Sequence, residues 1–424
     1  MRRIVAVAVQ FLNWRAFEAT PRVAGIRHPA PEMSTGGIIM SSNAALRLDA
    51  TTHRAPADIA VELGPLFAER AATATDEDRF VADNFASLKE AGLVEAGVPA
   101  ELGGGGASID DLAEMLRIVA RHCGSTALAL SMHTHQVAIP AWRWRVQKVA
   151  AVEPLLKRIA AERIILLSSG GSDWLGGSGK AEKVDGGYRI TARKVFSSGS
   201  PAGDLMMTGA ILESEGESPQ VLHFGIPMNS PAVKVQDNWR TLGMRSTGSN
   251  DVVIDGHVVP DAAVSVKRKA GEWHPLFHII ATIAFPLVYS VYLGVAESAR
   301  DIAIGLAKKK KLDQHLIQLA GRMDTELAAA RLAREFMLAA VRLDAPSAET
   351  VNQVMMGRQL VERHAIAAVE LGMQLAGGAG FFRAAGLERR FRDIQAARYH
   401  PLQVGPQAAY AGSIALGLPV DKVF

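Results

Sequence analysis

The stretch SSGGSDWLGGSG, which begins at Ser168, is the part of the chain whose residue types most directly suggest ligand binding. Its first four glycines are Gly170, Gly171, Gly176 and Gly177. Because glycine lacks a β-carbon, such positions can adopt positive φ angles or let a ligand lie against the backbone. An ordinary hairpin with a glycine-rich lead-in has the same local pattern, so this feature alone is a weak indication. The stretch marks a candidate ligand loop whose meaning depends on the rest of the chain.

Two histidines and one cysteine are the residues that a metal site would use first. His133 and His135 lie in STALALSMHTHQVA, which we interpret as a helix. Residues two apart on a helix point to different faces, so this pair cannot form the i, i+4 arrangement of a helical metal site. Cys123 is the single cysteine, and no set of metal ligands surrounds it in the sequence. We therefore expect no metal site and no internal disulfide, and the expected location is the reducing cytoplasm.

A β-rich region follows the glycine-rich stretch and must position it. KAEKV and YRITARKVFS alternate apolar and polar residues around Asp185-Gly186-Gly187, which predicts a β-hairpin with a tight turn. From Glu162 to about Val266, more short β-rich runs are separated by glycine, proline, asparagine or aspartate. This spacing predicts an antiparallel sheet or barrel.

Helical periodicity occupies the chain on both sides of the β-rich region. One helical part runs from about Ala55 to Lys157, and three long apolar-striped segments follow Trp273. These segments are Leu276–Leu306, Asp313–Leu343 and Ser347–Ala376, and Val404–Leu416 completes a predicted antiparallel four-helix bundle. The predicted fold class is α+β, with an extension at 1–54, a helical domain at 55–160, an antiparallel β-domain at 161–268 and a helical bundle at 269–424.

Composition narrows the class of protein. The chain has 424 residues, of which 49% are hydrophobic and 21% charged, as is typical of soluble globular proteins. Its 46 basic and 43 acidic residues give a net charge of +3, which is too balanced to suggest a nucleic-acid partner.

Two segments have features of a signal peptide or of a membrane-spanning helix. The first residues resemble the start of a signal peptide, but polar residues interrupt the apolar run. We hypothesise that residues 1–32 are a disordered or wrongly included extension, with Met33 or Met40 as the true start. Leu276–Ala296 is long enough to span a bilayer, yet Pro286 near its middle favours a buried core helix.

Helices, a small β-domain and a helical bundle, in this order, resemble the acyl-CoA dehydrogenase superfamily. Five segments carry the resemblance, which covers residues from about 55 to 417. They are GLVEAGVPAELGGGGASIDDL, STALALSMHTH, the stretch from Ser168 to Asp204, LGMRSTGSNDVVIDGHVVPDAAV and MQLAGGAGFFRAAGLERRFRD. Each motif is weak by itself, and their common order makes the resemblance strong.

The resemblance implies a flavin cofactor, FAD or alternatively reduced FMN, in a homodimer or homotetramer. The residues that match the lining of the flavin ring are Ser168, Ser172, Phe196, Ser197 and Ser198. The residues that match the turn at the flavin pyrophosphate, reached across a dimer, are Gln374, Gly377 and Gly378. The alternatives are that Phe196 is sheet core and that the glycines only end a helix.

The catalytic position departs from the family pattern. Dehydrogenases of this family use a glutamate to remove the α-proton of an acyl thioester. Depending on alignment, that position here is Pro401 or Val404, and the place used by other relatives is near Ala284–Phe285. None of these is a carboxylate, so a dehydrogenase would have to recruit one, such as Glu388 or Asp393.

His400 is the catalytic candidate that remains. It stands where the superfamily's flavin-dependent monooxygenases carry a histidine near the flavin C4a. A neutral imidazole there can hydrogen-bond oxygen or take a substrate proton, and the ordinary histidine pKa suits both roles at pH 7. The alternative is a structural loop residue.

Three functional readings follow. The first, favoured by overall similarity, is an oxidoreductase acting on the CH–CH bond of an acyl-CoA, with an electron-transfer flavoprotein as partner. The second is a monooxygenase that receives reduced flavin from a flavin reductase. The third is an inert flavin-binding member of the family.

Overall fold

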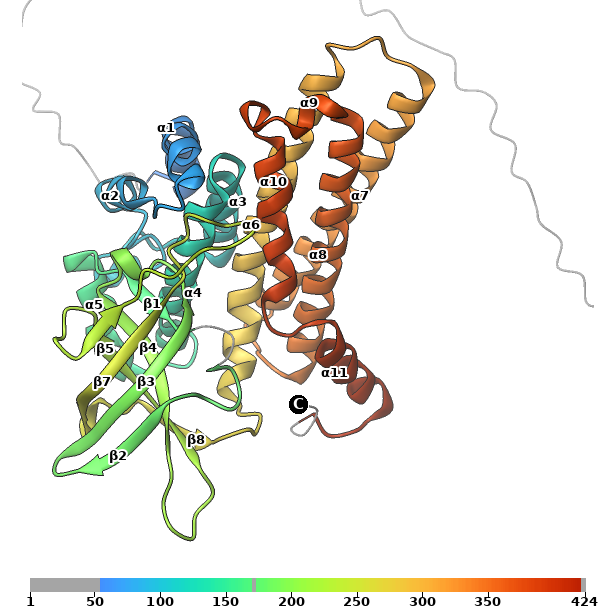
Figure 1. The fold of residues 1–424 in the computed structure, drawn as a ribbon. Coiled ribbons are helices and arrows are strands. Elements are labelled where there is room, and N and C mark those ends of the chain that lie inside the picture. Colours follow the sequence, from blue (N-terminus) through green and yellow to red (C-terminus); the bar gives the residue numbers. More distant parts are fainter. Residues whose placement is uncertain (1–53, 170–172, 421–424) are drawn as a thin grey trace, which may run out of the picture. The chain divides into compact units, whose positions relative to one another are not determined.

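The computed structural model describes residues 54–169 and 173–420 (Figure 1). The predicted extension and the hypothesis about its start concern residues that lie outside these ranges. The N-terminal part is helical and consists of α1 (Pro56–Asp76), α2 (Ala82–Glu90), α3 (Ile109–His122), α4 (Gly124–Arg145) and α5 (Glu153–Glu162). Ser108 and Asp111 form a capping box at the start of α3, which satisfies backbone N–H groups there. The cap fixes where α3 begins after the glycine-rich PAELGGGGA segment.

The middle of the chain forms one eight-stranded sheet. Its strands are β1 (Leu166–Ser168), β2 (Lys180–Val184), β3 (Gly187–Ser197), β4 (Leu205–Leu212), β5 (Gln220–Pro227), β6 (Val233–Val235), β7 (Asn250–Pro260) and β8 (Val266–Lys269). The order is β6-β7-β3-β2-β4-β5-β8, with β1 also paired to β4. The predicted hairpin is present as β2 and β3, paired from Lys180 with Thr191 to Val184 with Gly187.

The sheet is mostly antiparallel, as predicted, but two of its pairs are parallel. β4 pairs in parallel with β1 and with β2. The reason is topological. Because β3 reverses the chain between them, β4 runs in the same direction as β2, and it lies beside β2 instead of beside β3.

The C-terminal part is built around α6 (Leu276–Ala307), with α7 (Gln314–Val341) and α8 (Ala348–Ala376) beside it (Figure 1). Two short helices follow, α9 (Gly378–Phe381) and α10 (Leu387–Ile394), and then α11 (Val404–Leu416). The bundle differs from the prediction in its fourth helix, since α10 packs against both α6 and α8 whereas α11 packs against α8. Only Gln407 and Tyr410 of α11 are buried, so this helix lies at the edge of the bundle and does not form its fourth core helix.

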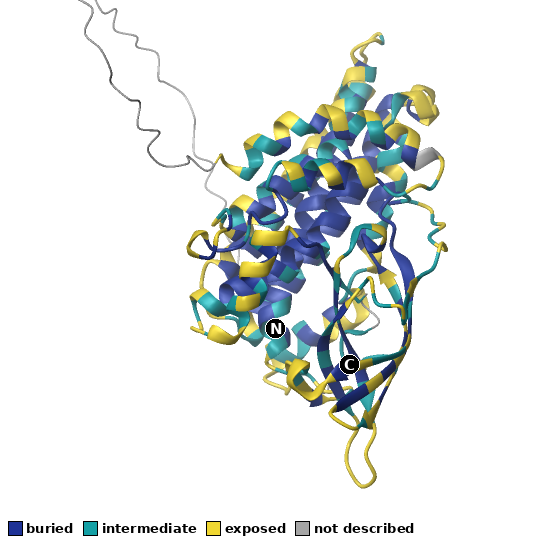
Figure 2. Cartoon of the chain, turned by 90° about the vertical axis from the view of Figure 1, so that its left-hand side faces the viewer, coloured by how far each residue is buried: buried dark blue, intermediate teal, exposed yellow. Residues whose placement is uncertain are grey.

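Helix α6 is the core of the molecule and not a membrane span. Within the described residues it alone is long and apolar enough to cross a bilayer, yet 94% of its most apolar window is buried. It packs against α3 and α4 as well as α7 and α8, and Figure 2 shows the buried residues concentrated in these central helices. The prediction of a buried core helix is confirmed.

One face of α7 remains apolar and exposed. On this face Leu332 is 73% exposed and Phe336, one helical turn further, is 41% exposed. Leu343, which is 63% exposed, lies in the turn just after the end of α7. We predict that a second copy of this chain covers this face, in keeping with the dimer or tetramer expected from the sequence.

Light scattering on the purified protein tests this prediction. A mass of two or four chains is expected, and Leu332→Glu combined with Phe336→Glu should lower it. As a control, Leu242→Glu changes an exposed leucine outside α7 and should leave the mass unchanged. A monomeric wild type would contradict the prediction.

Candidate active site

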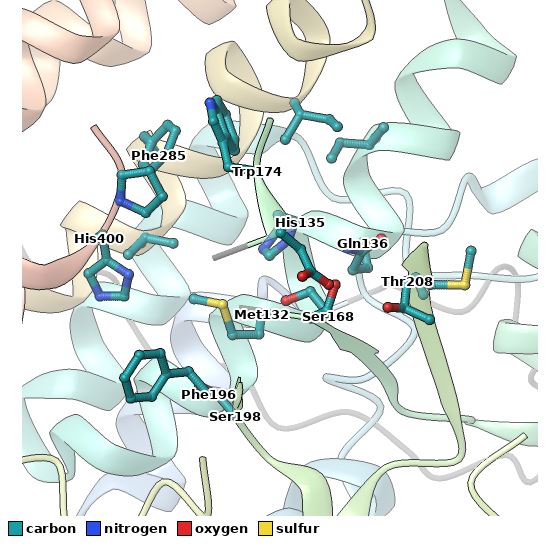
Figure 3. Close-up of a pocket in the computed structure, with 18 of the residues that line it drawn as sticks. Met132, His135, Gln136, Ser168, Trp174, Phe196, Ser198, Thr208, Phe285 and His400 are labelled. Atoms are coloured by element: carbon teal, nitrogen blue, oxygen red, sulfur yellow. The ribbon is translucent and has the colours of Figure 1, made fainter. Parts of the chain in front are cut away.

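A cavity of about 710 Å³ lies between α4, the sheet and α6 (Figure 3). Its walls come from α4, the end of β1, strands β3 to β5, helix α6 and the segment that follows α10. Most of the lining is apolar or aromatic, including Trp174, Phe277 and Phe285. The cavity therefore suits a largely apolar, flat molecule with a few polar groups.

The structure brings four of the sequence-predicted residues to this cavity. They are Ser168, Phe196, Ser198 and His400. Ser197 is fully buried and is absent from the cavity lining. Ser172 lies outside the described residues. Gln374, Gly377 and Gly378 are exposed at the end of α8 and do not line the cavity.

A β-bulge explains why Phe196 and Ser198 face the cavity. The pairing of β3 with β7 shifts register between Lys194 and Ser197, and Phe196 has a φ of 58°. The extra residue turns the Phe196 ring out of the sheet, where it is 56% exposed. It meets Trp239 edge-on with ring centroids 5.8 Å apart. The alternative that Phe196 is sheet core is therefore wrong.

The turn after α8 has a clear structural role within one chain. Gly377 has a φ of 58°, which favours glycine, and its N–H donates to the Met373 carbonyl at 2.9 Å. Lys310 donates to the carbonyls of Leu375 at 3.0 Å and Ala376 at 2.6 Å. These bonds satisfy the end of the helix. A contact of Gln374, Gly377 and Gly378 with a partner subunit's flavin stays a prediction.

His400 faces the cavity on one side and a buried tyrosine on the other. Its Nε2 lies 2.5 Å from the Tyr292 hydroxyl. Burial raises the pKa of Tyr292 well above its ordinary value, so this hydroxyl keeps its proton. Because the hydroxyl needs an acceptor, it donates to Nε2, and the neutral imidazole then carries its own hydrogen on Nδ1. His400 therefore offers an N–H donor.

Arg358 fixes the segment that carries His400. Its side chain is fully buried in α8 and donates to the carbonyls of His400 at 2.8 Å and Ala397 at 3.2 Å. Glu362 pairs with it at 2.7 Å. Tyr289 also donates to the Ala397 carbonyl, at 2.7 Å. The backbone before His400 is thus held by two side chains from two helices.

The two histidines of α4 have different roles. Both nitrogens of His133 are used by the backbone, since Nε2 lies 2.8 Å from the Val94 carbonyl and Nδ1 accepts from Leu166 N–H at 2.9 Å. His133 thereby ties α4 to β1. His135 instead lines the cavity. The expectation that the two rings point to different faces is confirmed.

Buried cations hold the loop that leads into the sheet, and the sequence reasoning missed them. Lys194 pairs with Asp173 at 2.7 Å and donates to the Gly209 carbonyl at 2.6 Å. Arg268 donates to the carbonyls of Trp174 at 3.2 Å and Leu175 at 2.5 Å. The burial of Lys194 could have been predicted, because this residue continues the inward-facing series Tyr188, Ile190 and Ala192 of β3.

No free carboxylate reaches the cavity from the described residues. Asp173 is the one acidic lining residue there, and Lys194 neutralises it. Glu388 pairs with Arg392 at 2.7 Å, and Asp393 accepts from Met244 N–H at 2.6 Å without lining the cavity. Of the positions that the resemblance matched to a base, Ala284, Phe285 and Pro401 reach the cavity, whereas Val404 is exposed and does not line it.

The cavity also contains polar atoms that no described residue satisfies. Within residues 54–169 and 173–420, the Thr208 hydroxyl and the Trp174 indole nitrogen are buried without a hydrogen-bond partner, and both residues line the cavity. Buried polar groups are usually paired, so these atoms point to a bound ligand with complementary groups. A flavin ring, which carries carbonyl oxygens, ring nitrogens and an N–H, fits this requirement.

Four buried histidines predict a loss of stability in mild acid. Burial lowers the pKa values of His133, His135 and His223 to about 4 and that of His400 to about 3. The unfolded chain takes up protons near pH 6.5 whereas the folded chain does not, so stability is complete above pH 7 and falls as the pH falls below it.

We expect the free energy of unfolding to fall by roughly 2 to 3 kcal/mol between pH 7.5 and pH 6. Calorimetry at these two pH values measures the change, and the interval from pH 7.5 to 8.5 is the control, where these groups contribute nothing. An unchanged stability from pH 7.5 to pH 6 would contradict the burial of neutral imidazoles.

Comparison with known proteins gives the same family at both ends of the chain. The acyl-CoA dehydrogenase N-terminal domain matches residues 62–155, and the acyl-CoA dehydrogenase C-terminal domain matches residues 287–403. The amino sugar nitrososynthase DnmZ of Streptomyces peucetius is 27% identical over 78% of this chain and 86% of its own length.

A second relative and a solved structure extend this likeness over most of the chain. A pigment production hydroxylase of a Rhodococcus species is 27% identical over 85% of this chain and 95% of its own. The structure of KijD3 with FMN and an amino-keto sugar nucleotide is 26% identical, with a TM-score of 0.80 over 89% of this chain and 98% of that one. With the matching domain order and the five shared segments, the chain belongs to the acyl-CoA dehydrogenase superfamily.

Proposed function

We propose that this protein is a flavin-dependent monooxygenase that acts on a small organic substrate. Reduced flavin supplies two electrons to O₂, so that one oxygen atom enters the substrate and the other leaves as water. The observation that carries the proposal is the lining of the cavity, where the described residues offer neutral imidazoles and no unpaired carboxylate. Dehydrogenation of an acyl thioester needs an anionic base beside the α-carbon, and the cavity does not provide one.

The flavin would be held at the sheet side of the cavity. Ser168, Ser198 and Thr208 offer hydroxyls there, and the Thr208 hydroxyl has no partner among the residues that the structure describes. The Phe196 ring, turned out of β3 by the bulge, would cover one face of the flavin. For the tests below we take FMN, which the KijD3 complex contains, with FAD as the alternative.

His400 would act on the oxygen that reaches the flavin. Its Nδ1–H can donate to an oxygen atom, and Tyr292 holds the ring in the tautomer that makes this possible. The apolar and aromatic walls exclude water, which strengthens such a hydrogen bond and limits the loss of reduced oxygen to solvent.

The relatives support oxygen chemistry over dehydrogenation. Two of them are named as a hydroxylase and a nitrososynthase, and both align over most of their length. The proposed partner is a flavin reductase, since a monooxygenase of this kind must receive its flavin reduced. An electron-transfer flavoprotein would be the partner under the dehydrogenase reading.

One pair of measurements decides between the readings. The purified protein is titrated with FMN and with FAD, and the reduced complex is then mixed with oxygenated buffer while absorbance and hydrogen peroxide are followed. We expect flavin binding, and slower release of hydrogen peroxide than from free reduced flavin. In parallel, the oxidised complex is mixed anaerobically with acyl-CoAs of several chain lengths. Rapid reduction by any of them would overturn the proposal and restore the dehydrogenase reading.

A further inference from the structure

His135 is a polar group of the cavity that the proposed chemistry leaves unused. It lies on α4, is 7% exposed and lines the cavity, where Figure 3 shows it projecting beside Gln136 toward the space bounded by Ser168 and Trp174. Its Nδ1 lies 3.0 Å from the Ser131 carbonyl, one helical turn earlier. A carbonyl can only accept, so Nδ1 carries the hydrogen and the Nε2 of the neutral ring has a free lone pair.

His133, two residues earlier on α4, is a purely structural histidine and serves for comparison. His133 is bonded at both nitrogens to the backbone, at 2.8 Å to Val94 and 2.9 Å to Leu166. Within the described residues, His135 has a backbone partner at Nδ1 and none at Nε2. The second nitrogen is therefore available to a molecule in the cavity.

His135 and His400 present opposite hydrogen-bonding groups to one cavity. Tyr292 donates to Nε2 of His400 and leaves its Nδ1–H as a donor, whereas the Ser131 carbonyl engages Nδ1–H of His135 and leaves its Nε2 as an acceptor. Both rings line this cavity. A molecule bound between them meets a donor on one side and an acceptor on the other.

The wall near these groups is aromatic. Trp174 stacks on Phe277 with centroids 5.0 Å apart and lies 5.8 Å from Phe285. Stacked rings of this kind favour a planar, apolar body. Only a molecule that also carries an N–H or O–H group would satisfy the free acceptor of His135.

We propose that His135 binds the substrate by accepting a hydrogen bond at Nε2 from an N–H or O–H group of a planar, largely apolar molecule. That the bound molecule is the substrate rests on the proposed function, whereas the preference for a hydrogen-bond donor does not. Burial lowers the pKa of His135 to about 4, so the acceptor stays unprotonated over the whole neutral range. A methylated analogue, which has lost the donor, should bind more weakly.

The test uses three matched pairs of probes, each with its methylated analogue. They are indole and 1-methylindole, 2-naphthol and 2-methoxynaphthalene, and carbazole and 9-methylcarbazole. Calorimetry measures their binding to the full-length protein, with and without FMN. In at least one pair we expect the donor compound to bind about 3- to 10-fold more tightly, as one net hydrogen bond provides.

Two variants assign that preference to His135. In His135→Phe, which keeps a ring but has no acceptor, the two members of the pair should bind equally. In His135→Gln, whose amide oxygen can accept, the preference should largely return. No preference in any pair with the wild type, or an undiminished preference in His135→Phe, would overturn the proposal.

A spectroscopic measurement on the wild type does not depend on the folding of any variant. In protein labelled with ¹⁵N histidine, the donor compound should shift the Nε2 resonance of His135 upfield, and its methylated analogue should not. Equal shifts from both compounds would contradict the proposal. Failure of the protein to bind any flavin would instead contradict the monooxygenase function. The preference for hydrogen-bond donors, measured without FMN, would be unaffected.

Discussion

Replacing His400 by phenylalanine is expected to lower the rate of substrate oxygenation by about 10² to 10⁴-fold, the range typical for loss of a positioned proton donor or acceptor. The ring shape is kept, so the packing against Tyr289 and Tyr292 survives. What is lost is the Nδ1–H of a ring that lines the cavity. Reduced flavin should still react with oxygen, but a larger share of that oxygen should leave as hydrogen peroxide.

The informative quantity is the ratio of oxygenated product to oxygen consumed. It should fall steeply in His400→Phe while the affinity for flavin stays within a few-fold of wild type. His315→Phe is the matched control, because that histidine is exposed and lies outside the cavity lining. If His400→Phe keeps the wild-type ratio, His400 has no role in the oxygen chemistry.

Tyr292 and His400 form one hydrogen-bonded pair, and the sequence predicted only the histidine. The motif around His400 was recognisable from resemblance, but its hydrogen-bond partner lies 108 residues earlier, in the middle of the most apolar helix. From the sequence, a tyrosine in such an apolar helix is interpreted as a core residue without a polar role. Only the packing of α6 against the segment after α10 shows that its hydroxyl sets the tautomer of a histidine.

His135 shows a second limit of the sequence. The spacing from His133 correctly predicts that the two rings leave α4 on different faces. It does not say which face meets the sheet and which meets the cavity, because that depends on how α4 packs against β1 and α6. The element types were predictable from periodicity, and the use of their polar residues was not.

For Arg358 the sequence pattern predicts exposure to solvent, and the structure shows burial. Arg358 and Glu362 are four apart in a long helix, a pattern typical of exposed ion pairs. In the structure both are buried, with side chains 0% and 6% exposed. The pair is covered because the segment from Gln395 to His400 crosses over it, and the carbonyls of Ala397 and His400 accept hydrogen bonds from the arginine.

Arg358→Met should therefore cost about 3 to 5 kcal/mol of stability, because it leaves Glu362 buried without a partner. The melting temperature should fall by roughly 4 to 6 °C, since the shift per kcal/mol becomes smaller as the chain becomes longer. The exposed pair of Arg300 with Asp324 at 2.8 Å is the matched control, and Arg300→Met should cost less than about 1 kcal/mol.

A double variant separates stability from positioning. Arg358→Met with Glu362→Leu removes the stranded charge as well, so much of the lost melting temperature should return. The carbonyls of Ala397 and His400 still lack their donor, so the segment that carries His400 is held less firmly. The ratio of oxygenated product to oxygen consumed should then remain low although the fold is restored. A double variant that recovers both properties would show that Arg358 serves stability alone, and one that recovers neither would show that the apolar pair cannot replace the buried charges.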